Sequence, residues 1–288
     1  MLSHTGGGHR ASAGAVRDEL HRLHGDAVQV ELLDLFTALD LWPFDRLPAW
    51  WPAMIGMRGL PWALLYRLTN GAKRMKVLSR LAWPYVGATC QRILRQHPAD
   101  VVVSFHPVPN YTLQRVYAQE PTKPSLATIV LDLVSVHAAW FVPGYDLYVV
   151  PTAGAAARAC QWGVPSERLQ VVGMPTRRSF VERMDLPRET ARRHLGLDDE
   201  KPLVLFVGGG EGMGPIEAVI KAVGAARPPA QLAVITGRND TLRRRLIRLD
   251  LPLRVEGFVT EMELWFRAAD LLVTKAGPNT LAEAFITG

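Results

Sequence analysis

A run of glycines in the second half of the sequence is built like a phosphate-binding loop. Five of the seven residues 208–214 are glycine, and they follow the apolar residues 203–207 directly. Successive backbone N–H groups in such a loop form a cradle for an anion, and Pro215 suits the first turn of a helix whose N-terminus adds to it. The loop lacks the Gly-Lys-Ser/Thr ending of the ATPase type. We favour phosphate binding, and a flexible surface turn is the alternative.

A second segment suited to phosphate chemistry lies near the end of the chain. Lys275 follows a predicted strand, and Thr280 and Glu283 stand in the helix expected after it. A lysine and free N–H groups could meet a diphosphate. Glu283, at i+3 from Thr280, lies on the same helix face and could accept both hydroxyls of a ribose. The alternative for Glu283 is a solvated position on that face.

The start of the chain offers a third glycine turn and a residue that could act as a base. Residues 6–11 fit a G-x-G-x-x-A turn that opens a helix, and His9 stands in its first turn. A helix N-terminus disfavours imidazolium, so this ring tends to stay neutral and able to accept a proton. A structural histidine is the alternative. Glu31 and Asp34, at the end of the next predicted strand, also leave an NAD-binding interpretation open.

The composition is that of a globular chain with an anionic partner. Of 288 residues, 48% are hydrophobic and 21% charged, and the net charge is +6,. Two cysteines, Cys90 and Cys160, are too few for a secreted disulfide framework or a metal cluster,. No apolar run approaches the about 20 residues of a membrane span, and Met1 does not begin a signal peptide. We therefore expect a cytosolic protein, or one on the cytosolic face of a membrane.

Positive charge and tryptophan are concentrated in residues 40–95. This window holds nine basic and two acidic residues, a net +7 (9 − 2), and five of the eight tryptophans. Tryptophan favours the lipid headgroup region, and Lys or Arg gains about 1 kcal/mol near an anionic surface. Contact with an anionic membrane is therefore predicted, and helices that pack their tryptophans inside are the alternative. The residues expected at the membrane are Trp50, Trp51, Trp62, Arg67, Lys73, Arg74 and Lys76.

Short β-rich runs alternate with amphipathic helical stretches along the chain, which predicts an α/β fold with parallel sheets. Two Rossmann-like halves result, residues 1–175 and 188–288, joined by a polar linker at 175–187. Both look incomplete, because the first strand would be only residues 1–3 and the last helix ends with the chain. Strands are predicted at 27–33, 101–105, 126–130, 147–150, 169–172, 203–207, 232–236, 253–256 and 271–274. Helices are predicted at 9–23, 85–96, 110–118, 152–162, 215–226, 240–249, 261–268 and 279–286.

In this order, the motifs resemble those of the monogalactosyldiacylglycerol synthases and processive diacylglycerol glucosyltransferases, relatives of the lipid-II synthase glycosyltransferases. The resemblance runs nearly end to end and is carried by residues 5–13, 132–141, 173–175, 208–215 and 275–278. It implies a GT-B fold, two Rossmann-like domains facing a cleft: a first domain facing acceptor and membrane, and an incomplete second domain binding UDP-sugar. It also implies inverting transfer of a hexose from a UDP-sugar to diacylglycerol, without an essential metal or a cofactor.

The same resemblance implies roles for individual residues. His9 matches the candidate catalytic base and Glu283 the ribose-binding carboxylate. Asp132 and His137 match a motif of the first domain on the acceptor side of the cleft. The other expected donor-binding residues are Gly8, Gly209, Gly210, Glu211, Gly212, Met213, Gly214, Phe258, Val259, Lys275, Ala276, Gly277, Pro278 and Thr280. Within this set, residues 209–214 would surround the diphosphate and the backbone of 258–259 would read the uracil.

The chain departs from the family pattern in two places. His4 stands where the pattern has an aspartate, and Gly288 ends the chain before the family's Gln- and Glu-containing segment that grips the hexose. Galactose, glucose and glucuronic acid therefore stay open as the sugar. The alternative functions are transfer to another lipid, as in lipid-II synthesis, and a truncated remnant that binds nucleotide or membrane without catalysis.

Two further classes fit less of the sequence. An NAD-dependent oxidoreductase would leave the second glycine loop and Lys275 without a role. A nucleic-acid binder would present basic residues and stacking aromatics along one face, and no recognised module of that kind is present, so no nucleic-acid partner is expected. The sequence therefore predicts a peripheral enzyme on the cytosolic side of a membrane.

Overall fold

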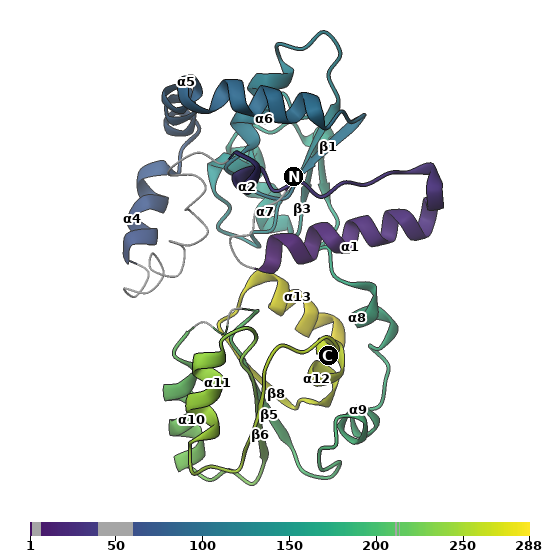
Figure 1. The fold of residues 1–288 in the computed structure, drawn as a ribbon, viewed down its shortest axis with the longest axis vertical. Helices are drawn as coiled ribbons and strands as arrows, with labels where there is room; N and C mark the ends of the chain where they lie inside the picture. The colour runs from purple at the N-terminus through teal and green to yellow at the C-terminus, as the bar shows by residue number, and fades with distance from the viewer. Residues whose placement is uncertain (2–6, 40–59, 211, 213) are drawn as a thin grey trace. The chain divides into compact units, whose positions relative to one another are not determined.

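The computed structural model describes residues 1, 7–39, 60–210, 212 and 214–288 of the chain. The chain divides into two units, Met1–Pro175 and Thr176–Gly288. Each unit contains a four-stranded parallel sheet with helices packed against it (Figure 1). The α/β class predicted from the alternating pattern is confirmed.

The sheet of the first unit follows the order of the chain, β1-β2-β3-β4. Its strands are β1 Val101–Ser104, β2 Ser125–Ile129, β3 Leu147–Val150 and β4 Leu169–Val171. The longer helices are α1 Gly7–His24, α4 Leu60–Thr69, α5 Ala72–Gln96, α6 Asn110–Tyr117 and α7 Ala153–Gln161, with short turns α2 Leu35–Leu39, η1 Gly25–Ala27, η3 Ala138–Trp140 and η4 Ser166–Arg168. Trp140, Tyr145 and Tyr148 are among the largest fully buried side chains, so the core lies between this sheet and its helices.

The predicted strand at 27–33 is wrong. η1 occupies the start of this stretch, and Asp34 makes a single bridge after it. Val28 and Val30 are half-buried and Gln29 is exposed, which is the alternation that suggested a strand. The backbone at Val28 is also extended, but extended backbone forms a strand only when a neighbour completes its hydrogen-bond ladder,.

The first residue of the chain pairs with the outer side of β1. The Met1 amino group donates to the Val103 carbonyl at 2.8 Å, and the Phe105 N–H donates to the Met1 carbonyl at 2.9 Å. A strand was predicted at 1–3, and its residues 2 and 3 lie outside the described residues.

The sheet of the second unit has the order β7-β6-β5-β8, which places β5 between β6 and β8. Its strands are β5 Leu203–Val207, β6 Gln231–Ile235, β7 Leu253–Glu256 and β8 Leu271–Thr274. Its helices are α8 Arg178–Glu182, α9 Arg188–His194, α10 Ile216–Ala225, α11 Asp240–Ile247, α12 Met262–Ala268 and α13 Pro278–Thr287. In the ladders, Val207 is in register with both Ile235 and Thr274. The loops after these three strands therefore start side by side at one edge of the sheet.

The predicted linker at 175–187 needs a correction, since the second unit begins at Thr176 rather than at residue 188. This stretch contains α8, and Phe180 of α8 is fully buried in the core of the second unit. The Phe180 ring lies 5.8 Å from the ring of Phe266. The polar composition of this stretch predicted a linker, whereas a single buried aromatic residue holds the short helix against the core.

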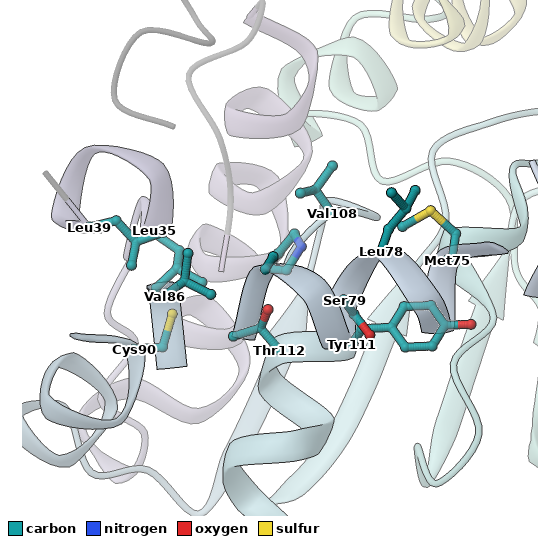
Figure 2. Close-up of a pocket in the computed structure, with 12 residues that line it drawn as sticks. Leu35, Leu39, Met75, Leu78, Ser79, Val86, Cys90, Val108, Tyr111 and Thr112 are labelled. Carbon is teal, nitrogen blue, oxygen red and sulfur yellow. The ribbon is translucent and has the colours of Figure 1, made fainter. Parts of the chain in front are cut away.

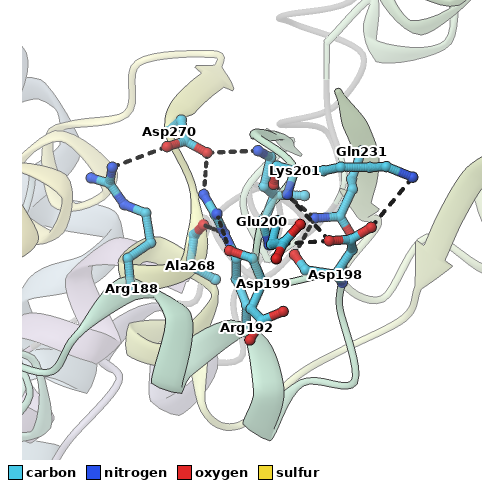
Figure 3. Close-up of polar contacts among 10 residues, drawn as sticks. Arg188, Arg192, Asp198, Asp199, Glu200, Lys201, Gln231, Ala268 and Asp270 are labelled. Carbon is cyan, nitrogen blue, oxygen red and sulfur yellow. Dashed lines mark hydrogen bonds and ion pairs between the residues drawn. The ribbon is translucent and has the colours of Figure 1, made fainter. Parts of the chain in front are cut away.

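Arg192, which is buried, and the more exposed Asp270 fasten α9 to the opposite, amino-terminal edge of the sheet (Figure 3). Asp270, just before β8, accepts hydrogen bonds from Arg188 at 3.0 Å, from Arg192 and, at 2.6 Å, from the Leu203 N–H. Arg192 is buried and also donates to the Ala268 carbonyl at 3.0 Å. This cluster ties β5 and β8 together at their starts, so their ends are held in register as well.

Candidate functional site

The glycine loop after β5 is packed so closely at Gly208 and Gly212 that a side chain would not fit at either position. A Cβ on Gly212 would lie 2.3 Å from the Thr236 carbonyl oxygen, and a Cβ on Gly237 would lie 2.3 Å from the Gly210 carbonyl oxygen. Gly209, Gly212 and Gly237 also have positive φ angles,. The loops after β5 and β6 are therefore pressed together. Glu211 and Met213, predicted to bind the donor, lie outside the described residues.

Hydrogen bonds hold the two loops in this arrangement. The Gly212 N–H donates to the Gly209 carbonyl at 3.0 Å, and the Arg238 N–H donates to the Gly210 carbonyl at 2.8 Å. Asn239 donates from Nδ2 to the Gly212 carbonyl at 3.2 Å. The described residues of the loop are thus hydrogen-bonded to the loop after β6 at the carboxyl edge of the sheet.

Lys275 brings a positive charge to the same loop. A Cβ on Gly209 would meet Lys275 Cε at 3.2 Å and Nζ at 3.7 Å, and a Cβ on Gly214 would meet Lys275 Cβ at 3.9 Å. Ala276, which follows, adopts a positive φ of 57°, so the backbone turns sharply into α13. The structure therefore brings the predicted lysine and the predicted glycines together.

The N-terminus of α13 continues this turn. Gly277 caps the helix, Pro278 is its first residue, and the Thr280 hydroxyl lies near Gly277. Pro215 precedes α10 in the same way after the glycine loop. Two helix N-termini, two glycine-containing turns and Lys275 are combined here, an arrangement that can bind a doubly charged anion.

Arg238 is a candidate site residue that the sequence did not reveal. Its Nη1 would lie 3.8 Å from a Cβ on Gly210, and its guanidinium stacks over the Phe258 ring at 4.5 Å. Phe258 is 57% exposed, whereas Val259 packs on the core. The available signal was the Gly-Arg-Asn sequence directly after a buried strand, at the edge where ligands bind in such sheets.

Glu283 is half-buried rather than solvated. Burial raises the pKa of its carboxyl to about 7, while Arg177 lowers this pKa and Glu263 raises it. The carboxyl binds a proton in the folded chain at pH values where the unfolded chain has released it. The contribution of Glu283 to stability is therefore complete below its ordinary pKa of about 4.5 and is lost as the pH rises toward 7,.

Replacing Glu283 tests whether burial raises the pKa of its carboxyl, and the test needs no ligand. We expect Glu283→Gln to unfold at a higher temperature than the wild type, by a difference that grows from pH 4.5 to pH 7.5. Glu217→Gln is the matched control, because the hydrogen bond from Lys221 lowers the pKa of Glu217 and the sign reverses. Thermal unfolding followed by circular dichroism measures both. If the difference in unfolding temperature between Glu283→Gln and the wild type does not change with pH, the raised pKa of Glu283 is contradicted.

His9, the predicted base, is half-buried near the start of α1. Its Nδ1 lies 2.6 Å from the Phe105 carbonyl oxygen, which can only accept a hydrogen bond,. Nδ1 therefore carries the proton and Nε2 is the basic nitrogen. Burial lowers the pKa of His9 below its usual value, against the opposing effect of the Phe105 hydrogen bond. The ring is thus neutral at pH 7, as a base must be. Gly8 precedes His9 on α1.

Asp132 and His137 lie on the segment that ends at Trp140, but they make different contacts. Asp132 accepts a hydrogen bond from the Trp140 indole at 2.8 Å, and the Trp140 ring lies 6.4 Å from the ring of His9. Burial raises the pKa of Asp132, while the hydrogen bond from Trp140 lowers it. His137 instead lies 3.1 Å from the Thr69 hydroxyl of α4. The structure thus links Asp132 to the surroundings of His9. It links His137 to α4 through its ring and to Asp132 through its backbone.

Helix α4 is fastened to this segment by its inner face. The Tyr66 hydroxyl donates to the Ser135 carbonyl at 2.8 Å, and the Tyr66 ring lies 4.9 Å from the ring of His137. Asn70 accepts a hydrogen bond from the Ala138 N–H at 3.0 Å. The segment next to His9 and the basic, apolar window of the sequence are therefore in direct contact.

The outer face of α4 and the first half of α5 expose apolar and basic side chains. Trp62 is 38% exposed, whereas Trp83 is half-buried against Arg115 at 4.3 Å. Trp50 and Trp51 lie outside the described residues. The exposed apolar residues are Leu60, Leu64, Leu65, Leu68, Val77, Leu78, Leu81 and Tyr85. The exposed basic residues are Arg67, Lys73, Arg74, Lys76 and Arg80.

The residues of the NAD-binding interpretation do not support it. Glu31 does not end a strand, since the strand predicted before it is wrong, and its carboxylate lies 2.7 Å from His97 Nδ1. In the described part of the chain, no group of three His, Cys, Asp or Glu residues is arranged to hold a metal ion.

Two protein families match the chain. Residues 203–288 match the C-terminal domain of glycosyltransferase family 28, which defines the class of the second unit. Residues 9–176, more than half of the chain, match the family described as monogalactosyldiacylglycerol (MGDG) synthase. The chain therefore belongs to the monogalactosyldiacylglycerol synthase family, and the resemblance inferred from its motifs is confirmed.

Curated relatives agree with this family. A probable MGDG synthase of Glycine max is 36% identical over all of this chain and 56% of its own length. Those of Spinacia oleracea and Arabidopsis thaliana (MGDG synthase 1) are 36% and 35% identical over all of this chain and 57% and 56% of theirs. All three are described as chloroplastic. The chain thus spans a little over half the length of these relatives.

Among solved structures, that of Anabaena Alr3699/HepE in complex with UDP has a TM-score of 0.47. The match covers 70% of this chain and 61% of that chain at 14% identity.

Proposed function

We propose that this chain transfers a hexose from a UDP-sugar to diacylglycerol at a membrane surface. The observation that carries the proposal is the meeting of Lys275, the glycine loop and the Arg238 loop at one sheet edge, in a chain of this family. The name of the relatives favours galactose as the sugar. Transfer to another lipid acceptor is the second candidate, because the apolar surface of the first unit does not select the headgroup.

The reaction proposed is a direct displacement. The acceptor hydroxyl attacks the anomeric carbon from the side opposite the diphosphate, UDP leaves, and the configuration inverts. His9 Nε2 takes the hydroxyl proton, since Nδ1 is already committed to the Phe105 carbonyl,. Loop N–H groups, Lys275 and the N-terminus of α13 stabilise the charge that develops on UDP. We expect this reaction to need no metal or cofactor.

The surface formed by α4 and α5 is the proposed contact with anionic lipid. Leu60, Leu64 and Leu68 recur at every fourth position, so they form one exposed stripe of α4,. Lys73, Lys76 and Arg80 are spaced for one side of α5 and are exposed,. Apolar and basic side chains together are typical of a helix that lies in the membrane interface. Within the described residues, no helix has both the length and the apolar character needed to span a bilayer.

An apolar pocket in the first unit suits the lipid acceptor (Figure 2). It has a volume of about 170 Å³ and lies among α2, α5 and the start of α6. Met75, Leu78 and Val86 come from α5, and Leu78 is also 43% exposed on the proposed membrane surface. Val108, which also lines the pocket, belongs to the same loop as Phe105, the hydrogen-bond partner of His9. The apolar lining of this pocket suits part of an acyl chain.

The membrane contact is tested by removing charge from α5. We expect Lys73→Gln with Lys76→Gln to weaken binding to anionic vesicles by about 30-fold, since each cation contributes about 1 kcal/mol and 1.4 kcal/mol is tenfold. Binding to neutral vesicles should not change. Arg92→Gln is the matched control, because Arg92 is exposed on the opposite side of the same helix,. Vesicle sedimentation that is equal for the double variant and this control would exclude the proposed surface.

The reaction itself is tested by incubating the chain with UDP-galactose, UDP-glucose or UDP-glucuronate and vesicles that contain diacylglycerol. We expect a glycosyl-diacylglycerol with the inverted, β configuration, identified by chromatography and NMR. A polyprenyl-linked acceptor in the same assay tests the second candidate. Saturable UDP binding without any transfer would favour a non-catalytic remnant over the proposed enzyme.

A further inference from the structure

His106 is a buried imidazole beside the proposed base, and the mechanism described above gives it no task. It follows β1 by two residues and is 8% exposed. Its ring centroid lies 4.7 Å from that of His9, and the two ring planes are inclined at 58°. A second titratable ring in contact with a base affects both the orientation of that base and its proton affinity.

Hydrogen bonds determine the tautomer of each ring. The Val108 N–H donates to His106 Nδ1 at 3.2 Å, so this nitrogen is unprotonated and the neutral ring carries its proton on Nε2,. His9 has the other tautomer, with its proton on Nδ1 against the Phe105 carbonyl. Residues 105–108 therefore fix both rings, one through a carbonyl and the other through an N–H.

A buried polar network holds this loop in place. Ser104 Oγ lies 2.9 Å from the His106 carbonyl oxygen and 2.5 Å from Asn110 Oδ1. Asn110 Nδ2 lies 3.3 Å from the carbonyl oxygen of Trp140, the other ring near His9. Ser104 and Asn110 are fully buried. The Asn110 amide is therefore connected to both residues whose rings lie beside His9, directly to the Trp140 backbone and through Ser104 to the His106 backbone.

At most one of the two neighbouring rings, His9 and His106, carries a positive charge at a time. Burial lowers the pKa of His106 well below its usual value, and a charge on His9 lowers it further. Asp132 lies behind the Trp140 indole, and Arg10 follows His9 on α1 and is exposed. The Met1 ammonium group is bound by the Val103 carbonyl, and the Met1 carbonyl accepts from the Phe105 N–H. A proton taken up by His9 therefore stays on His9, and His106 stays neutral.

We propose that His106 is a positioning residue for His9, a role that rests on the proposed hexosyl transfer. Its neutral ring excludes water from one side of the His9 ring. Its hydrogen bond with Val108 keeps the Phe105 carbonyl placed to bind His9 Nδ1–H. Nε2 of His9 is thereby left as the proton acceptor.

The matched pair His106→Ala and His106→Phe tests the proposal. Both variants remove the acceptor of the Val108 N–H, so both lose stability, but only alanine admits water beside His9. With alanine, we expect the pKa of His9 to rise by about one unit, and kcat to fall about tenfold on the acid limb of its pH profile with an unchanged KM for UDP-sugar. The acid limb of the kcat/KM profile should move to higher pH by the same amount. With phenylalanine, that limb should stay near its wild-type position.

NMR of the intact wild-type chain provides a readout that needs neither turnover nor a variant. Nitrogen shifts of the two imidazoles should show a proton on Nδ1 of His9 and on Nε2 of His106, and the opposite tautomer of His9 would overturn the proposal. An identical His9 titration in wild type and His106→Ala would also overturn it. If the His9 titration moves as expected while the wild type transfers no hexose, the positioning of His9 is supported and the proposed function fails.

Discussion

His9→Ala should lower the turnover of UDP-hexose by about 10²–10⁴-fold, the usual contribution of a positioned general base. Nδ1 of His9 is held by the Phe105 carbonyl, so Nε2 is the nitrogen that can accept the acceptor's hydroxyl proton. The affinity for UDP should not change, because the proposed phosphate site lies in the second unit. A lower kcat at constant UDP affinity is the signature of a group that acts in the transition state.

His21→Ala is the matched control for this variant. His21 is exposed on the same helix, α1, and takes no part in the proposed site. Its kcat should equal that of the wild type. Because His9 is half-buried and hydrogen-bonded to Phe105, thermal unfolding of both variants is measured beside the kinetics. Near-normal turnover by a folded His9→Ala protein would remove His9 from the mechanism.

Gly212→Ala should weaken UDP binding by about 100-fold, as expected when two charge-assisted hydrogen bonds of about 1.5 kcal/mol each are lost. The added Cβ would lie 2.3 Å from the Thr236 carbonyl oxygen and 2.8 Å from the Asn239 Cβ. Thr236 ends the buried core of β6 and cannot retreat, so the glycine loop must move instead. Its N–H groups then no longer converge on the phosphates. Calorimetric titration with UDP measures the loss.

Gly196→Ala separates this effect from backbone strain. Gly196 has a similar positive φ of 65°, but a Cβ there would meet only Arg254 Nη1 at 3.8 Å, an ordinary contact. Both variants should lose about 1 kcal/mol of stability to the left-handed conformation. Only Gly212→Ala should lose UDP affinity. Equal UDP affinity in the two variants would mean that the glycine loop does not bind the diphosphate.

The parts of the second unit that the sequence predicts best are those with strictly local causes. The strands at 203–207, 253–256 and 271–274 have the predicted bounds. The first is a continuous apolar run, the third is three apolar residues and a threonine, and polar residues or glycine follow all three, so the pattern indicates their limits,. The glycine loop and Lys275 were likewise identifiable, because each follows such a strand at the edge where ligands bind.

The features that the sequence does not predict depend on tertiary contacts. The stretch 27–33 has strand-like alternation, yet a strand also needs a neighbour to complete its ladder,. Arg238 reaches the site because the loop after β6 is pressed against the glycine loop, and His106 matters because α1 places His9 against it. For Arg238, the Gly-Arg-Asn sequence after a buried strand indicates only its place at the sheet edge, and the residues next to His106 do not indicate its contact with His9,.

The central claim is that the second unit binds a nucleoside diphosphate at the carboxyl edge of its sheet. Mapping UDP onto the isotope-labelled chain by amide chemical shifts tests it most directly. Saturable shifts should concentrate in residues 208–214, 237–239 and 275–280. Shifts confined to the first unit, or no saturable shift at millimolar UDP, would contradict the account.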